Sequence, residues 1–206
     1  MLLEPNDHVL FYGDSITDVG RRSCGEKLGG GYPRLLASQL AADLPDWELT
    51  FTNTGISGNR IYDLEERLEE DLLAHRPTLV SILIGINDTW RRYDRDVVSP
   101  IEEFDASYRR ILQRIDDELS AKIVVLEPFL LPVPEAKKQW REDLDPRIQA
   151  VREIARDTGA TFVPLDGLFA AASCRRRMDF WLPDGVHPSP AGHGLIAGAW
   201  ADAVLG

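Results

Sequence analysis

The chain alternates short apolar runs with longer amphipathic segments, and this alternation restricts the folds that it can adopt. Five runs have the apolar and β-branched content of strands, and they cover residues 9–12, 49–53, 79–84, 123–126 and 161–163. Hydrophobic residues recur every three or four positions in the segments predicted as helices, which are 32–44, 61–75, 101–119, 147–158, 165–172 and 190–205. This order predicts an α/β fold, with about five parallel strands and helices on both faces of the sheet.

The size and charge of the chain limit the number of domains and the classes of partner that it can have. The 206 residues contain no linker and no internal repeat, so residues 1–206 are predicted to form a single domain. The formal net charge of −11 repels phosphate backbones and anionic lipids, which argues against nucleic acid and against membranes as partners. No window approaches the roughly 18 consecutive apolar residues of a membrane-spanning helix.

The first residues and the cysteines indicate the compartment. The N-terminal sequence MLLEPNDH has neither the basic nor the apolar region of a signal peptide, so a cytoplasmic location is expected. Cys24 and Cys174 cannot form a disulfide framework and are interpreted as reduced thiols. The glycine-rich stretch 24–31 lacks the patterns of phosphate-binding loops and is predicted to be a flexible loop beside the ligand crevice.

Polar turns follow the first three predicted strands at the point where each strand ends. The residues in these turns are Asp14 and Ser15, then Ser57 and Gly58, then Asn87 and Asp88. Because the carboxyl ends of parallel strands meet at one edge of a sheet, these residues are expected to lie side by side. Each also has a structural interpretation, since serine suits a helix N-cap, glycine suits a turn and asparagine suits an Asx-turn.

A carboxylate and an imidazole lie three residues apart near the end of the chain. Asp184 and His187 precede the last predicted helix, and one turn of chain lets the carboxylate accept a hydrogen bond from one ring nitrogen. The other ring nitrogen can then face a serine hydroxyl, which is a poor nucleophile until a base takes its proton. Together with Ser15, these residues match the nucleophile, base and orienting carboxylate of a serine triad.

Four sequence blocks, GDSITD, NTGISGNR, GINDTW and DGVHPS, resemble those of the SGNH, or GDSL-type, hydrolases, with Ser15, Gly58, Asn87 and His187 at the name-giving positions. The resemblance spans nearly the whole chain and implies a flavodoxin-like, three-layer doubly wound sheet. It implies that Ser15 attacks an ester carbonyl, that His187 takes its proton, and that Asp184 orients His187. The backbone N–H groups of Ser15 and Gly58 and the Asn87 side-chain amide would form the oxyanion hole, and no metal or organic cofactor is expected.

The segments GINDTWRRYD and VHPSPAGH are most similar to carbohydrate-acetylesterase members, especially acetylxylan esterases. The favoured reaction is removal of an O-acetyl group from a sugar or xylo-oligosaccharide through an acyl-enzyme, and a homo-oligomer is suggested. Candidate substrate-binding residues are Asp14, Trp90, Arg91 and Trp181. Aromatic rings near the crevice suit stacking on sugar faces, and they suit packing of the loop or of a subunit interface as well. His193 is expected to have a structural role rather than to bind a metal.

Other functions stay open at this point. The same groups would serve a lysophospholipase, a thioesterase or a general short-chain arylesterase, although long acyl chains should need an apolar groove that the sequence does not show. A non-catalytic carbohydrate-binding protein could use the same fold, and turnover of p-nitrophenyl acetate by wild-type and Ser15→Ala protein distinguishes it. A nucleotide-binding flavodoxin-like domain is disfavoured by the acidic charge and the missing phosphate loop.

Overall fold

The computed structural model describes residues 1–23 and 25–206, so the thiol predicted at Cys24 lies outside the described residues. Five parallel strands form one sheet: β1 (His8–Gly13), β2 (Thr50–Asn53), β3 (Leu79–Leu83), β4 (Lys122–Leu126) and β5 (Thr161–Val163). Their order is β2-β1-β3-β4-β5, which is the flavodoxin-like order and confirms the predicted α/β fold. The direction of winding changes between β1 and β3, and such a switch point leaves a crevice at the carboxyl ends of the strands.

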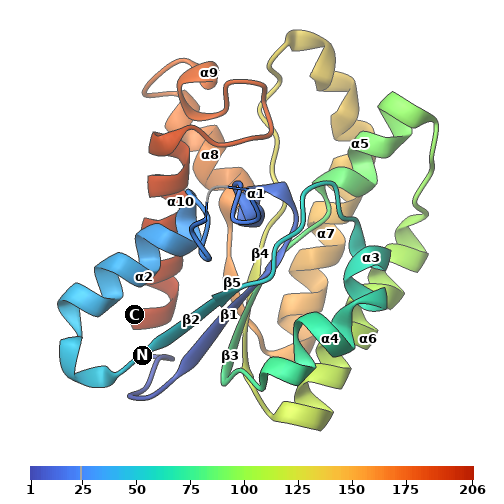
Figure 1. The fold of residues 1–206 in the computed structure, drawn as a ribbon. Coiled ribbons are helices and arrows are strands. Elements are labelled where there is room, and N and C mark those ends of the chain that lie inside the picture. The colour runs from blue at the N-terminus through green and yellow to red at the C-terminus, as the bar shows by residue number, and fades with distance from the viewer. Residues whose placement is uncertain (24) are drawn as a thin grey trace.

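Helices cover both faces of the sheet (Figure 1). One face carries α2 (Tyr32–Asp43), α8 (Leu165–Ser173) and α10 (Pro190–Leu205), and the other carries α3 (Ile61–Glu66), α4 (Leu68–Asp71), α6 (Ile101–Leu119) and α7 (Arg141–Thr158). Alternate residues of each strand point to opposite faces, so β1 gives Val9 and Phe11 to one core and Leu10 and Tyr12 to the other. None of the helices that the structure describes is long and apolar enough to cross a membrane.

Short elements gather at the carboxyl edge of the sheet, where the predicted polar turns lie. They are α1 (Ser15–Asp18), α5 (Ile86–Arg95), the 3₁₀ helix Glu135–Trp140 and α9 (Met178–Trp181). Asn87 therefore lies in the first turn of a helix, where the sequence predicted an isolated polar turn. Two further 3₁₀ helices, Pro45–Trp47 and Leu73–His75, connect elements elsewhere.

The segment 61–75 is not one helix, as predicted, but divides into α3, α4 and the 3₁₀ helix Leu73–His75. The division falls at Arg67, whose guanidinium donates hydrogen bonds to the carbonyl oxygens of Gly13 at 3.1 Å and Thr54 at 2.7 Å. These bonds tie the turn to the ends of β1 and β2. The helix predicted from residue 147 begins earlier, at Arg141, and contains Pro146, which removes a single backbone donor.

Candidate active site

Ser15 is the first residue of α1, directly after β1 reaches the edge of the sheet. The turn is tight, because a Cβ atom at Gly13 would lie 2.4 Å from the Leu83 carbonyl oxygen. Glycine is therefore required for β1 and β3 to approach each other here. The Asp14 carboxylate accepts the backbone N–H of Ile16 at 2.9 Å and caps α1. This short capped helix holds the Ser15 hydroxyl partly exposed at the edge of the sheet.

Ser15, His187 and Asp184 form a continuous hydrogen-bonded chain. Ser15 Oγ lies 3.0 Å from His187 Nε2, and His187 Nδ1 lies 2.7 Å from Asp184 Oδ2. The second carboxylate oxygen, Oδ1, accepts the backbone N–H groups of Val186 at 2.9 Å and His187 at 2.7 Å. Residues 172 positions apart in the sequence thus meet at one site, in a geometry that lets His187 take the Ser15 proton.

The environments of Asp184 and His187 favour opposite charges on the two groups. The hydrogen bond that His187 donates to Asp184 raises the pKa of His187 above its ordinary value, although burial of the ring opposes this. Partial burial by itself raises the pKa of Asp184, but hydrogen bonds from the His187 ring and from backbone N–H groups outweigh it and hold the pKa well below its usual range. Asp184 therefore stays ionised and stabilises the imidazolium form of His187.

The structure shows how the three donors predicted for an oxyanion hole are engaged. The backbone N–H groups of Ser15 and Gly58 donate to no acceptor in the described part of the chain. The Asn87 amide uses one hydrogen for the Asn59 carbonyl oxygen at 3.0 Å, and its oxygen faces Arg91 at 3.4 Å. Its second amide hydrogen remains available. An oxyanion hole needs donors that are not engaged by the protein itself.

Gly58 adopts a φ of +88°, a conformation that favours glycine, while a Cβ there would meet no atom within 4 Å. Glycine is thus required for the backbone conformation and not for close packing. The loop is held by Asp18, whose Oδ2 accepts the Ser57 hydroxyl at 2.7 Å and the Ser57 backbone N–H at 3.3 Å. Asp18 links the helix of Ser15 to the loop of Gly58, a role that its sequence context did not indicate.

Lys137 is a neighbour of the site that sequence reasoning missed. Its ammonium group donates to the Asp184 carbonyl oxygen at 2.6 Å and lies 4.7 Å from the centre of the Trp90 ring and 4.8 Å from that of Trp140. Burial lowers the pKa of Lys137, against the attraction of Asp184. The positive charge in turn opposes protonation of His187. No motif marks this residue, because it approaches the site from the 3₁₀ helix after the proline-rich segment.

Two carboxyl groups are buried beneath the site. Asp14 is fully buried, and burial raises its pKa to about 7, while its Oδ2 atom has no hydrogen-bond partner among the described residues. Burial raises the pKa of Asp88 to about 6, although it accepts hydrogen bonds from Ser99 and Ile61. Asp14 therefore cannot contact a substrate, and its expected role in substrate binding is corrected to that of a buried helix cap.

The other candidate residues occupy different positions. The Trp90 ring lies 5.7 Å from the His187 ring, so it borders the Ser15–His187 pair. The Trp181 indole donates to the Ala172 carbonyl oxygen at 3.0 Å and serves the packing of α9 on α8. His193 is buried, and its Nδ1 accepts the backbone N–H of Tyr32 at 3.3 Å; burial lowers its pKa to about 4. This is a structural contact at the start of α2.

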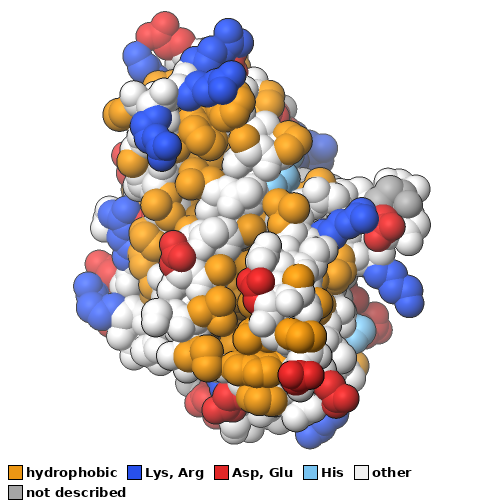
Figure 2. Space-filling model, turned by 90° about the vertical axis from the view of Figure 1, so that its left-hand side faces the viewer, with side chains coloured by type: hydrophobic (Ala, Val, Ile, Leu, Met, Phe, Trp, Pro, Cys, Tyr) orange, Lys and Arg blue, Asp and Glu red, His pale blue; other side chains and the backbone are white. Residues whose placement is uncertain are grey.

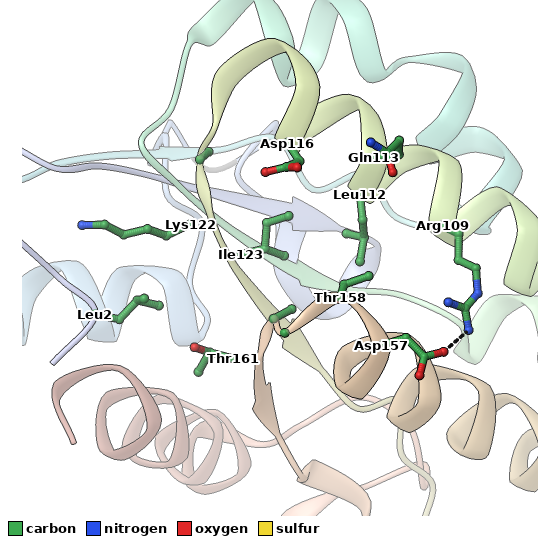
Figure 3. Close-up of a pocket in the computed structure, with 13 residues that line it drawn as sticks. Leu2, Arg109, Leu112, Gln113, Asp116, Lys122, Ile123, Asp157, Thr158 and Thr161 are labelled. Carbon is green, nitrogen blue, oxygen red and sulfur yellow. Dashed lines mark hydrogen bonds and ion pairs between the residues drawn. The ribbon is translucent and has the colours of Figure 1, made fainter.

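A cavity of about 500 Å³ lies at the opposite edge of the sheet (Figure 3). Its walls include Lys122 and Thr161, the first residues of β4 and β5, and Arg109, which pairs with Asp157 at 3.0 Å. Ligands of doubly wound sheets bind at the carboxyl ends of the strands, and these are the amino ends. This cavity is therefore separate from the site of Ser15.

One known protein with a similar sequence is an esterase. The chain is 35% identical over 209 aligned residues to an acetylxylan esterase of Geobacillus stearothermophilus, and the match covers 97% of this chain and 94% of that protein. A second relative, the uncharacterized protein YpmR of Bacillus subtilis, is 25% identical and covers 93% of this chain and 79% of its own.

Solved structures agree. Axe2, an acetylxylan esterase from Geobacillus stearothermophilus, superposes with a TM-score of 0.91 at 33% identity, covering 99% of this chain and 96% of its own. A GDSL-like lipase from Parabacteroides merdae superposes with a TM-score of 0.93 at 34% identity, and the match covers 98% of this chain and 97% of that protein. Residues 11–195 match the GDSL-like lipase/acylhydrolase family. The chain therefore belongs to this family and is a carboxylic ester hydrolase.

Proposed function

We propose that this enzyme removes O-acetyl groups from carbohydrate, with acetylated xylo-oligosaccharides or similar sugars as substrates. The observation that carries the proposal is the hydrogen-bonded chain from Ser15 through His187 to Asp184, at 3.0 and 2.7 Å, beside three available donors. The relative that acts on acetylxylan supports the acetyl-carbohydrate substrate. Trp90 beside His187 supports it too, because an indole face suits stacking on a sugar ring.

The reaction follows from the arrangement of the groups. Ser15 Oγ attacks the ester carbonyl carbon while His187 Nε2 takes the hydroxyl proton. The negative charge that develops on the carbonyl oxygen is stabilised by the N–H groups of Ser15 and Gly58 and by the Asn87 amide. Collapse of this intermediate breaks the bond to the sugar oxygen, which receives the proton from His187, and leaves an acetyl group on Ser15.

Water completes the cycle. His187 takes a proton from a water molecule, whose oxygen attacks the acetyl-enzyme carbonyl carbon through a second oxyanion. The bond to Ser15 Oγ then breaks, acetate leaves, and the proton returns to the serine. Asp184 stays ionised throughout and stabilises the imidazolium form of His187 in both halves of the reaction. No step requires a metal ion or an organic cofactor.

Acetate release from acetylated xylo-oligosaccharides tests the proposal directly. Wild-type protein should release acetate, and Ser15→Ala should lose nearly all of this activity while its circular dichroism spectrum is unchanged. Ser38→Ala, at an exposed position of α2, is the matched control and should behave as wild type. Equal rates for the wild type and Ser15→Ala would reject Ser15 as the nucleophile.

A substrate panel separates the acetyl-carbohydrate substrate from the other substrates that the family chemistry allows. Acetylated xylo-oligosaccharides, octanoyl esters and lysolipid are compared by kcat/KM under one set of conditions. The proposal expects the acetylated sugars to be the best substrates. A preference for octanoyl esters or lysolipid would instead indicate a lysophospholipase or thioesterase, and no turnover of p-nitrophenyl acetate would indicate a carbohydrate-binding protein.

A homo-oligomer and a cytoplasmic location remain predictions for this chain. Figure 2 shows hydrophobic side chains gathered on the side of the molecule that α2 and α10 form. Leu35 of α2 is 43% exposed. Two copies with a net charge of −11 repel each other, so they are expected to associate through surfaces with few charges. The α10 helix offers such a surface, because Asp202 is its single charged residue. Light scattering measures the mass in solution and so tests the predicted homo-oligomer. A monomeric mass at micromolar concentration would contradict the prediction.

A further inference from the structure

A hollow of about 390 Å³ adjoins the proposed oxyanion hole. Its lining includes Gly58, Asn59, Arg60, Arg91 and Arg95. The loop that lines the hollow is tied to the helix of Ser15, because the Ser57 hydroxyl donates to Asp18 of α1 at 2.7 Å, and to Asn87, whose amide donates to the Asn59 carbonyl oxygen at 3.0 Å. A sugar chain that extends from Ser15 past this loop is therefore expected to meet the hollow.

The lining of the hollow is rich in guanidinium groups, on a protein with a net charge of −11. Asp63 and Asp94 lie within ion-pair distance of these groups, and the buried Asp88 is attracted to Arg60. The hollow therefore offers an anion local positive groups within an overall negative field.

Two of the three guanidinium groups keep hydrogen-bond donors that no described residue uses. Arg60 Nε lies 3.9 Å from Asp63 Oδ2, and Arg95 Nε lies 4.0 Å from Asp94 Oδ2, so neither contact is a hydrogen bond. Asp63 Oδ2 instead accepts the Arg60 backbone N–H at 2.7 Å. Arg91 differs, since it pairs with Asp94 and also faces the Asn87 amide oxygen. Planar guanidinium donors match the two oxygens of a carboxylate.

We propose that this hollow is a subsite for a carboxylate carried by the sugar chain, so that the preferred substrates are acetylated oligosaccharides with a uronic acid residue near the acetyl group. This inference rests on the proposed acetyl-carbohydrate activity. Arg60 and Arg95 bind the carboxylate, and the acetyl carbonyl oxygen lies at the N–H groups of Ser15 and Gly58. The subsite lowers KM for acidic oligosaccharides and has little effect on kcat, because the carboxylate takes no part in the reaction.

The test compares two acetylated xylo-oligosaccharides of equal length, one with a uronic acid substituent and one without. The measured quantity is the ratio of their kcat/KM values at low ionic strength. Wild-type protein should prefer the acidic oligosaccharide by about five- to tenfold, as expected for a partly exposed charge-assisted contact, and added salt should reduce this preference. The double variant Arg60→Gln/Arg95→Gln should bring the ratio close to one, mainly through KM.

Matched variants keep the result interpretable. Arg34→Gln removes the same charge from α2, on the opposite face of the sheet, and should retain the wild-type ratio. If the double variant does not fold, Arg95→Gln alone suffices, since the Arg95 side chain is 68% exposed, and it should reduce the ratio by at least half. A wild-type ratio near one, or a ratio that the arginine variants leave unchanged, overturns the subsite.

A further arm places the carboxylate on the acyl group instead, with p-nitrophenyl succinate compared with p-nitrophenyl acetate. If the arginine variants reduce turnover of the succinyl ester and not of the acidic oligosaccharide, the hollow accepts an acyl group and the proposal is wrong. Failure of the proposed function looks different, because then neither oligosaccharide releases acetate while aryl esters are still hydrolysed. Neutral and acidic oligosaccharides hydrolysed equally would reject the subsite alone.

Discussion

Asp14, the residue before the proposed nucleophile, is buried at a cost in stability that depends on pH. Its carboxyl group is fully buried, and burial raises its pKa from 3.8 to about 7. Because the folded pKa lies above the unfolded one, the contribution of Asp14 to stability is fully present below about pH 4 and is lost as the pH rises through about 7. The difference is about three pKa units, and each unit corresponds to about 1.4 kcal/mol, so the loss is roughly 4 kcal/mol.

Asp14→Asn tests this reasoning, because asparagine keeps an oxygen for the Ile16 N–H but cannot ionise. Groups far from Asp14 contribute equally to the two proteins and cancel in the difference, whereas His187 and Asp88, which interact with the Asp14 charge, add a smaller change of their own. The difference in free energy of unfolding between the variant and the wild type should grow in favour of the variant by roughly 4 kcal/mol from about pH 4 to about pH 8. For a chain of this size this corresponds to roughly 10 °C in Tm. Urea denaturation followed by circular dichroism at each pH measures the free energies of unfolding.

A charge removed from the surface is the control. Asp202→Asn, at an exposed position of α10, changes the net charge equally and should show a difference from the wild type that is nearly constant with pH. If the Asp14→Asn and wild-type stabilities run parallel over the whole range, Asp14 is ionised in the folded protein at no cost, and the inferred effect of its burial is refuted.

Three further predictions concern activity. Since His187 must be neutral to act, kcat/KM should rise with pH through a pKa above 6.5. Asp184→Asn should move this rising limb of the pH profile to lower pH and reduce kcat by about 10⁴-fold. A limb that stays in place would contradict the assignment of His187 as the general base oriented by Asp184. Lys137→Met should move the limb the opposite way, to higher pH, because the ammonium charge that opposes protonation of His187 is lost; a shift to lower pH would count against it. Gly58→Ala keeps the backbone N–H but should lower kcat by about 10²-fold and stability by about 1 kcal/mol, because alanine disfavours the φ of +88° that positions this N–H. Wild-type kcat together with unchanged stability would show that this conformation does not require glycine.

Local sequence predicted the elements that local interactions determine. The central strand β3 is buried along its whole length, so its apolar run was recognisable, and α6 and α10 begin and end where their periodicity predicts. The positions of Ser15 and His187 followed from their order along a parallel sheet. The α5 helix was missed because its first turn, GIND, is made of residues that also form polar turns.

Contacts between distant segments could not be predicted in the same way. The break between α3 and α4 depends on carbonyl oxygens of β1 and β2 that Arg67 reaches in space. Lys137 and Asp184 meet because the 3₁₀ helix Glu135–Trp140 packs beside the loop before α10. The complete burial of Asp14 depends on the whole surrounding core, and its sequence neighbours suggest a residue in an open turn.

The wide separation of Ser15 and His187 along the polypeptide has a consequence for biosynthesis. The loop of His187 is fixed by α10, where Ser189 accepts the Gly192 N–H at 3.2 Å and Trp200 donates to Ser81 of β3 at 3.0 Å. If Ser15 and His187 act as proposed, a chain that has paired only its first three strands lacks the general base and is inert. Turnover during refolding would then report when the loop of His187 and α10 reach their places.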